Sequence, residues 1–315
     1  MVNIPESIVF GPVPSRRLGH SLGINNIPLK ICTYSCIYCQ LGKTKKKQIE
    51  RQQIYKTEKI VSAVKSKVQK AEEKRESVDY ITFVSNGEPS LDSKLGKEIL
   101  SLRGLGIKIA VITNASLLWK KNVRQQLINA DWISLKIDTV NQHIWKKINK
   151  PHKSLKLEKI MEGILDFSLS FKGDLTTETM LIQGVNDKIK SIEETAYFIE
   201  GLHPIKSYLS IPIRPPAETW VKPISKTILN SAYQIFKKHG IDVEYLIDYE
   251  GNNFGFIDNI EEDILSIASV HPIRKDGLIS LLKKSNNNWD IVKKLLSEDK
   301  LIEVEYNKKK FYLRK

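Results

Sequence analysis

The feature that most constrains the fold is an alternation of apolar strands and amphipathic helices between residues 18 and 239. Near-continuous apolar strands that alternate with helices are typical of a parallel sheet built from βα units. Six such units fall short of the eight in a closed barrel. We therefore predict an α/β fold with a parallel sheet, for which a doubly wound sheet is one possible architecture. Strands are predicted at 18–24, 78–85, 107–113, 132–137, 175–182 and 207–213, and helices at 56–74, 91–102, 117–129, 154–167, 189–201 and 223–239.

Residues 258–315 follow a different pattern, which predicts a second, smaller domain after a first domain at 1–257. Three short helical segments at 261–270, 276–284 and 288–298 precede two strands around a polar turn within 301–314. This order resembles a winged helix, a module that often binds nucleic acid. The turn at 307–310 is basic, but the module carries 12 basic and 10 acidic residues and is nearly neutral. A role in protein contact or as a lid is therefore an equal interpretation.

The charge of the chain is strongly positive, with a formal net charge of +14. The first 257 residues hold 38 basic and 26 acidic side chains, and a basic surface attracts polyanions. A solvated, lysine-rich surface is the alternative. No apolar run is long enough to span a membrane, and Met1–Glu6 lacks the basic and apolar parts of a signal peptide. A cytoplasmic location without membrane contact is expected.

All three cysteines lie close together, as Cys32, Cys36 and Cys39, in a C-x3-C-x2-C pattern. Three thiolates on one loop suit an iron–sulfur cubane, which takes one thiolate per iron and would keep one iron open. A structural zinc site needs a fourth ligand, for which His20 is the nearest histidine. A disulfide would leave one cysteine unpaired and needs an oxidising compartment. Inert core thiols are the remaining alternative.

Polar residues at the ends of the predicted strands are candidates for ligand binding, because parallel α/β folds place function there. Asn-Gly is also an ordinary turn, an asparagine before a helix also serves as an N-cap, and an inward-facing Lys–Asp pair can be purely structural. The candidates are Asn86, Gly87, Glu88 and Pro89 after the second strand, Asn114 after the third, Lys136 and Asp138 at the fourth, and Gly184 and Asn186 after the fifth.

Five basic residues are candidates for contact with the substrate or for catalysis. Arg16 and Arg17 precede the first strand, where they either reach an anionic group or form salt bridges at the barrel rim. Arg214 lies between prolines that stiffen its backbone, and a fixed guanidinium suits a carboxylate or phosphate. His152 follows the fourth strand as a candidate acid or base, although a lone loop histidine is more often incidental. Lys136 and Arg214 are also candidates for catalysis.

The cysteine pattern, with Tyr38 directly before the last cysteine, resembles the signature of the radical S-adenosylmethionine (SAM) superfamily. The resemblance implies an open, partial (βα)6 barrel, a [4Fe-4S] cluster on the three cysteines, and SAM on the fourth iron. It also implies a flavodoxin- or ferredoxin-like electron donor. The segment 86–89 is similar to the Gly-Gly-Glu element that holds the amino group of SAM in that family, with Asn86 replacing the first glycine. The end of the fourth strand, with Lys136 and Asp138, contacts the ribose and carboxylate of SAM in the family.

The phrases GPVPSRRLG at 11–19 and RPPAE at 214–218 resemble a branch of iron–sulfur oxidoreductases related to the archaeal wyosine-base synthase, a tRNA-modifying enzyme. That synthase has additional cysteines that this chain lacks, so its pyruvate-dependent chemistry is not carried over. The resemblance implies reductive cleavage of SAM to a radical that abstracts hydrogen from the substrate. The basic first domain and the winged-helix-like module favour tRNA or another RNA as that substrate. The alternatives are a protein, peptide or small metabolite as substrate, with the C-terminal module as docking element or lid, and a zinc-bound regulator.

Overall fold

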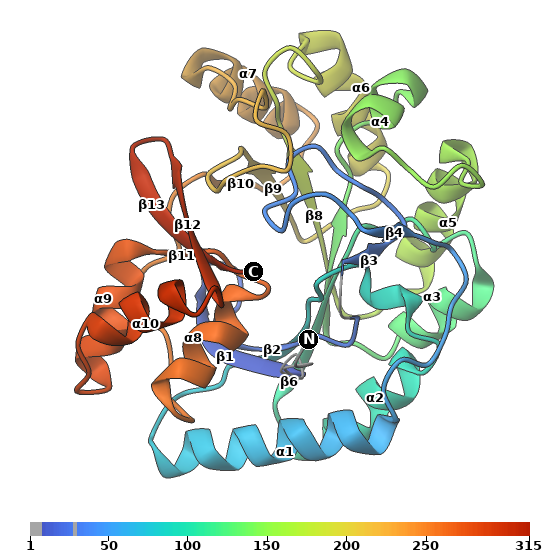
Figure 1. Ribbon diagram of the computed structural model, residues 1–315. Helices are drawn as coiled ribbons and strands as arrows, with labels where there is room; N and C mark the ends of the chain where they lie inside the picture. The colour runs from blue at the N-terminus through green and yellow to red at the C-terminus, as the bar shows by residue number, and fades with distance from the viewer. Residues whose placement is uncertain (1–7, 28–29) are drawn as a thin grey trace.

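One curved eight-stranded sheet dominates the computed structural model, which describes residues 8–27 and 30–315 (Figure 1). The N-terminal segment on which the expected lack of a signal peptide rests lies outside the described residues. From β2 to β10 the strands are parallel, whereas β1 pairs with β2 in the antiparallel sense. In their order across the sheet, the strands are β1 (Val9–Ser15), β2 (Gly19–Ile24), β5 (Tyr80–Phe83), β6 (Lys108–Thr113), β7 (Trp132–Lys136), β8 (Asp174–Met180), β9 (Lys206–Ser210) and β10 (Val243–Leu246).

The strand order distinguishes the two predicted architectures. A doubly wound sheet reverses its strand order at a switch point, but here each parallel strand pairs with the next one along the chain. All crossovers therefore run in one direction, and the helices cover the outside of a partial barrel (Figure 1). This confirms the partial (βα)6 barrel. The helices are α1 (Thr57–Glu73), α2 (Leu95–Leu102), α3 (Lys121–Leu127), α4 (Gln142–Asn149), α5 (Leu157–Ser170), α6 (Ile189–Glu200) and α7 (Lys226–Lys238).

The helices pack on the sheet through the apolar stripes that the sequence shows. In α1, Ile60, Val64, Val68 and Ala71 recur every three or four residues and are all buried. Full burial of one aliphatic side chain of this size contributes about 1.5–3 kcal/mol. Such stripes explain why the six predicted strands and their helices are all present, with ends that differ by a few residues.

Several elements differ from the sequence prediction. The segment around Gly11 and Pro12 forms β1, a strand that was not predicted, with a shift in register between Phe10 and Val13. Strand β10 and helix α4 were not predicted. Helix α3 is shorter than the predicted 117–129, because its first residues form a turn. Two short 3-10 helices, η1 (Pro89–Leu91) and η2 (Arg103–Leu105), flank α2.

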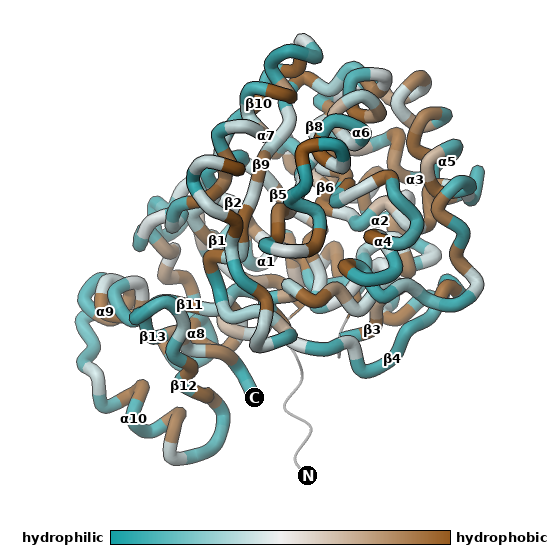
Figure 2. Tube along the Cα trace, turned by 90° about the horizontal axis from the view of Figure 1, so that it is seen from above, coloured by the Kyte–Doolittle hydropathy of each residue, from teal (hydrophilic) through white to brown (hydrophobic). Residues whose placement is uncertain are grey.

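The C-terminal residues form a group of helices and strands beside β1 (Figure 2). The three helices and two long strands match the predicted pattern, and a short strand adds a third member to the antiparallel sheet. Their assignment as a winged helix, and as a separate domain from residue 258, remains a prediction. These elements are α8 (Ile260–Ala268), β11 (Ile273–Arg274), α9 (Lys275–Lys284), α10 (Asp290–Ser297), β12 (Leu301–Tyr306) and β13 (Lys309–Arg314).

The C-terminal part is firmly attached to the barrel. Phe10 of β1 belongs to the apolar core that α8, α9 and α10 build. Lys67 of α1 lies between Asp258 and Asp263, at 2.5 and 3.0 Å, and only 8% of its side chain is exposed. Because separation would break a buried ion pair and expose this shared core, the contacts favour a fixed wall over a freely opening lid. Within the described residues, no helix is long and apolar enough to span a membrane.

Candidate active site

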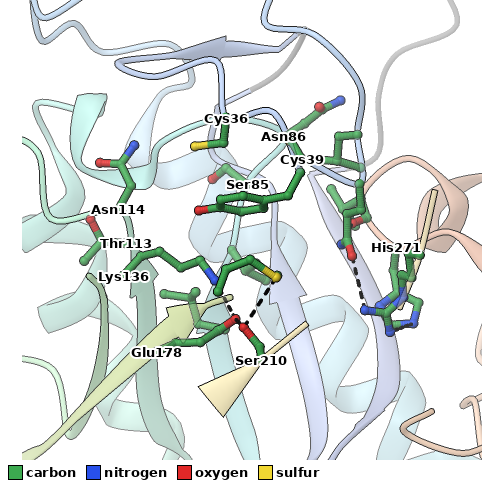
Figure 3. Close-up of a pocket in the computed structure, with 18 of the residues that line it drawn as sticks. Cys36, Cys39, Ser85, Asn86, Thr113, Asn114, Lys136, Glu178, Ser210 and His271 are labelled. Atoms are coloured by element: carbon green, nitrogen blue, oxygen red, sulfur yellow. Dashed lines mark hydrogen bonds and ion pairs between the residues drawn. The ribbon is translucent and has the colours of Figure 1, made fainter. Parts of the chain in front are cut away.

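A pocket of about 350 Å³ opens at the carboxyl ends of the parallel strands, between the cysteine loop and the C-terminal elements (Figure 3). This is the end of a parallel barrel where function is expected. The volume is within the range of small-molecule sites. Eleven of the predicted site residues line the pocket: Arg17, Cys32, Cys36, Tyr38, Cys39, Asn86, Gly87, Glu88, Asn114, Lys136 and Arg214.

The cysteine triplet, Cys32, Cys36 and Cys39, lies on a loop between the two strands of a small sheet, β3 (Ile31–Cys32) and β4 (Lys46–Lys47). All three cysteines are free in the structure, and each residue is partly exposed, so the disulfide alternative gains no support. Among the described residues, no three histidine, cysteine or carboxylate groups are arranged to hold one metal ion, so the zinc alternative gains no support.

The surroundings of the triplet fit metal-bound thiolates. Burial raises the pKa of the Cys32 thiol to about 12 and raises the pKa of Cys36 as well. Thiols in such a place lose their protons only beside a strong positive charge, which bound metal supplies. Each of the three sulfurs also accepts a side-chain N–H, an arrangement that suits thiolate ligands of iron–sulfur clusters.

Gly87 brings the end of β5 against the cysteine loop. A Cβ atom at this position would lie 1.9 Å from the carbonyl oxygen of Ile31, so only glycine fits. The close contact is with the protein's own chain, and it fixes the segment before Cys32 against the end of β5.

Glu88 is buried and holds the ends of two strands together. Its carboxylate accepts hydrogen bonds from the main-chain N–H of Ser90 at 3.0 Å, the Thr113 hydroxyl at 2.6 Å and the main-chain N–H of Asn114 at 2.8 Å. Burial raises the pKa of Glu88 although these donors favour the charged form. The expected role as acceptor for an ammonium group therefore competes with three internal hydrogen bonds.

Asn114 links the third strand end to the cysteine loop. Its side-chain amide donates to the Thr33 hydroxyl at 2.8 Å and to Cys32 Sγ at 3.5 Å. The N-cap alternative is not supported, because α3 begins at Lys121, well after this residue.

One side of the pocket, here called the strand wall, consists of Arg17, Lys136, Glu178 and Ser210. Glu178 is its centre (Figure 3). The carboxylate binds Lys136 Nζ at 2.6 Å and Arg17 at 2.8 Å, and it accepts the Ser210 hydroxyl at 2.9 Å. The distance from Lys136 Nζ to Asp138 is longer, at 4.0 Å. The predicted Lys136–Asp138 pair is therefore weaker than the Lys136–Glu178 pair.

The strand wall carries a net positive charge. Burial alone would raise the pKa of Glu178, but Lys136 and Arg17 outweigh it and lower this pKa to about 2. The guanidinium of Arg17 also lies over the rings of Trp132 and Tyr208, at 5.9 and 5.7 Å from their centroids. One carboxylate shared by two cations leaves an excess positive charge, which suits an anionic ligand group.

The opposite side, here called the seam wall, consists of Gln40, Arg214, Glu250 and His271. Arg214 donates to Gln40 Oε1 at 3.1 Å, to Glu250 at 2.9 Å and to His271 Nε2 at 3.2 Å. Gln40 in turn donates to the carbonyl of Val270 at 3.1 Å. The residue after Cys39 is therefore held by the barrel on one side and by the C-terminal part on the other.

His271 is neutral in this setting. Burial, followed by the nearby Arg214, lowers the pKa of His271 to about 3. Because Nε2 accepts from Arg214, the ring proton lies on Nδ1. Burial would raise the pKa of Glu250, but Arg214 outweighs it and lowers this pKa. The seam wall thus contains one balanced ion pair and a neutral imidazole.

Asp138 and Asn186 lie behind the pocket surface. Asp138 is fully buried and accepts hydrogen bonds from the Tyr38 hydroxyl at 2.5 Å and the Asn149 amide at 2.8 Å. Asn186 donates to the carbonyls of Asp138 and Met180, at 2.9 and 2.8 Å. Both residues tie the ends of β7 and β8 together, and their expected direct contact with a cofactor is not supported.

Four further candidates also fail to line the pocket formed by the described residues. Arg16 donates to the carbonyl of Tyr245 at 2.6 Å, which agrees with the structural alternative of a rim contact. Within the described part of the chain, the only hydrogen bond of the His152 side chain is the one it accepts from the main-chain N–H of Ser154. Gly184 occupies an exposed turn with φ of 70°, and Pro89 begins η1.

Sequence reasoning missed several pocket residues. Glu178 and Ser210 lie on predicted strands, and their inward positions follow from the period of two that already selected Lys136. Glu250 and His271 belong to segments after the barrel, where no local pattern marks them.

The fold and the site define a class of enzyme: a parallel partial barrel with a loop of three free cysteines at the carboxyl ends of its strands. The model of the Radical SAM superfamily matches residues 26–197, and the chain belongs to that superfamily. The UPF0026 protein MJ1312 of Methanocaldococcus jannaschii is 47% identical over 310 residues, covering 98% of this chain and 96% of the relative. The ribosomal RNA large subunit methyltransferase N of Nitrosopumilus maritimus is 25% identical over 75% of this chain and 67% of its own length.

Solved structures show the same fold. A radical SAM methyltransferase from Sphaerobacter thermophilus matches with a TM-score of 0.53 and 17% identity, over 72% of this chain and 66% of that one. Structures of TYW1 are also similar, at lower TM-scores of 0.46 and 0.39. Members of the superfamily use a [4Fe-4S] cluster and SAM, and the cysteine triplet fits this cluster.

Proposed function

We propose that this protein modifies RNA by abstracting a hydrogen atom from a nucleotide held in the pocket. The observation that carries the proposal is a lysine-rich surface beside the cysteine loop. Segments 42–49 and 139–157 contain no acidic residue, and they lie side by side. The nine lysines of these segments, here called the lysine border, are Lys43, Lys45, Lys46, Lys47, Lys146, Lys147, Lys150, Lys153 and Lys156.

Contacts place the lysine border next to the cysteine triplet. Lys47 Nζ donates to the carbonyls of Lys150 and Pro151, both at 3.3 Å. Within the triplet, the main-chain N–H of Ile37 donates to the carbonyl of Ile148 at 2.9 Å. A polyanion bound along the border would therefore pass the edge of the pocket.

Few carboxylates neutralise the positive charge of the lysine border. Among the described residues, Glu218 is its only carboxylate partner and pairs with Lys43 at 3.4 Å and Lys150 at 2.5 Å. Trp220 follows shortly after and is 49% exposed. Lysines contact phosphates and an exposed indole stacks on a base, the combination by which single-stranded nucleic acid is bound.

The pocket suits a single nucleotide taken out of the RNA strand. A cluster held by Cys32, Cys36 and Cys39, with SAM at its open iron, would supply one-electron cleavage of SAM and, through it, the removal of a hydrogen atom from a substrate C–H bond. Lys136 and the Asn86–Glu88 segment are proposed to hold SAM, and Tyr38 to pack beside it. Arg214 on the seam wall is proposed to anchor the nucleotide. The C-terminal part, which closes that side of the pocket, is proposed to exclude water. The RNA-directed name of the Nitrosopumilus relative is consistent with this substrate class.

A small metabolite is the second candidate, favoured by the pocket volume of about 350 Å³. In that case the C-terminal part closes the site as a fixed wall, and RNA leaves SAM cleavage unchanged. The two candidates therefore differ in whether RNA stimulates the formation of 5′-deoxyadenosine.

The test compares wild type with the triple variant K45E/K46E/K47E, using dithionite as reductant. We expect RNA binding to weaken strongly with salt in the wild type. The slope of log affinity against log salt should fall by about 2–3 in the variant, because each lost phosphate contact removes about 0.7–0.9. K108E/K172E/K238E, at the opposite end of the barrel, is the charge-matched control and should bind RNA as wild type does.

Two results would contradict the proposal. One is RNA affinity that does not change with salt, combined with SAM cleavage that RNA does not stimulate. The other is a triple variant that is impaired only when a flavodoxin- or ferredoxin-like protein replaces dithionite, because the border would then bind the electron donor.

A further inference from the structure

Each sulfur of the cysteine triplet accepts one N–H from a side chain outside the triplet. The three donors come from separate parts of the fold: the segment before β3, the loop after β6 and the end of α4. Nothing in the cysteine spacing requires them. The pairs are Lys30 Nζ with Cys39 Sγ at 3.4 Å, Asn114 Nδ2 with Cys32 Sγ at 3.5 Å, and Asn149 Nδ2 with Cys36 Sγ at 3.4 Å.

The two asparagines are held so that one amide hydrogen is directed at a sulfur. A side-chain amide has two N–H groups. In Asn114 the second N–H is bound by the Thr33 hydroxyl at 2.8 Å, and in Asn149 it is bound by Asp138 at 2.8 Å. Each oxygen contact therefore orients the other N–H toward the sulfur, and the donors are fixed before any cluster binds.

Lys30 differs from the asparagines because it brings a full positive charge. Its ammonium group donates to the carbonyl of Gly42 at 2.7 Å and to Cys39 Sγ, and the residue is only 8% exposed. No carboxylate of the described residues lies within salt-bridge distance of it. A buried cation without a carboxylate partner is costly, unless a group of negative charge, such as a thiolate-bound cluster, lies beside it.

We propose that Lys30, Asn114 and Asn149 set the reduction potential of the cluster. Hydrogen bonds and positive charge at the ligand sulfurs stabilise the more negative, reduced state, and so raise the potential. Lys30 has the largest effect because its charge acts over a longer distance than an amide dipole. The three residues are positioning residues that act through the cysteines. The proposal rests on the cluster of the superfamily and is independent of RNA as substrate.

The experiment measures the midpoint potential of the reconstituted cluster by anaerobic titration, followed by electron paramagnetic resonance, without SAM or RNA. We expect K30M to lower the equilibrium constant for one-electron reduction about tenfold, a shift of about 59 mV to lower potential. K30R should retain most of the wild-type potential because it keeps the charge. N114A and N149A should shift the potential in the same direction by smaller amounts.

The matched control is K172M, which removes an exposed lysine before β8, at the opposite end of the barrel, and should leave the potential unchanged. Iron and sulfide content is determined for every variant, and only fully loaded samples are compared. If K30M assembles less cluster, K30Q and the two asparagine variants provide the same comparison. A wild-type potential in every fully loaded variant would overturn the proposal.

Discussion

The two walls of the pocket both contain buried charged side chains, but they neutralise these charges in different ways. The strand wall and the seam wall each bury a glutamate beside an arginine, yet Glu178 is shared by two cations whereas Glu250 binds one. The first arrangement keeps excess positive charge at the pocket, and the second is balanced. We therefore expect the stability of the strand wall to depend mainly on its carboxylate. The stability of the seam wall should depend on a neutral histidine and on contacts between distant segments.

The largest expected effect is at the strand wall, in Glu178→Ala. Removing the carboxylate leaves Lys136 and Arg17 as unpaired charges in a buried site, which costs about 3–5 kcal/mol of unfolding free energy. Urea denaturation at neutral pH measures the loss. Glu58→Ala, which breaks an exposed pair with Lys97, is the control and should give no measurable change.

The same residue predicts a pH dependence. The pKa of Glu178 in the folded protein is about 2, below its ordinary value of 4.5. Its stabilising effect is therefore fully present above pH 4.5 and is lost as the pH falls toward 2. The acid-induced loss of stability should be shallower in Glu178→Ala. An equal pH dependence in both proteins would show that the carboxylate is not held by the two cations.

An intermediate effect is expected where the strand ends meet the cysteine loop, in Gly87→Ala. The added methyl group would lie 1.9 Å from the Ile31 carbonyl oxygen, and overpacking of this kind costs about 1–3 kcal/mol. Iron content after reconstitution should also fall. Gly104→Ala, where the new Cβ meets nothing within 4 Å, should retain wild-type stability and iron; an equal result for both variants would remove the argument.

A smaller effect distinguishes the seam wall, in His271→Gln. The pKa of His271 is lowered from 6.5 to about 3, so the folded state resists protonation and stability decreases as the pH falls below 6.5. Between pH 7.5 and 5.5 this one residue should account for about 1.4 kcal/mol of lost stability. The loss should be absent in the variant, as measured by urea denaturation at both pH values. A wild-type loss that His271→Gln retains would contradict the assignment.

The difference between the walls also explains what the sequence could predict. The βα units and the inward position of Lys136 follow from regular periods, because alternate residues of a strand face the same side. The period did not separate a partial barrel from a doubly wound sheet. The same rule placed Asp138 inward, but it does not reveal that Tyr38 and Asn149 would cover its carboxylate. The period of a strand predicts which way a side chain points. Whether that side chain reaches the pocket depends on the neighbouring residues that pack around it, which the period does not show.

The seam wall could not be predicted in the same way. His271 follows α8 in the C-terminal part, and its approach to Arg214 depends on how that part packs against β1. Strand β1 itself was obscured by Gly11 and Pro12, residues that usually interrupt strands. Contacts between segments separated by more than 200 residues, such as Gln40 with Val270, have no local signal.

The most direct test of the central claim is the formation of 5′-deoxyadenosine from SAM by the reconstituted protein under anaerobic conditions with dithionite. The wild type should form 5′-deoxyadenosine, and Cys36→Ser should form none because the triplet no longer holds a complete cluster. A wild-type protein with a full complement of iron and sulfide that forms no 5′-deoxyadenosine, even with RNA present, would contradict the account. Equal formation by Cys36→Ser would contradict it as well.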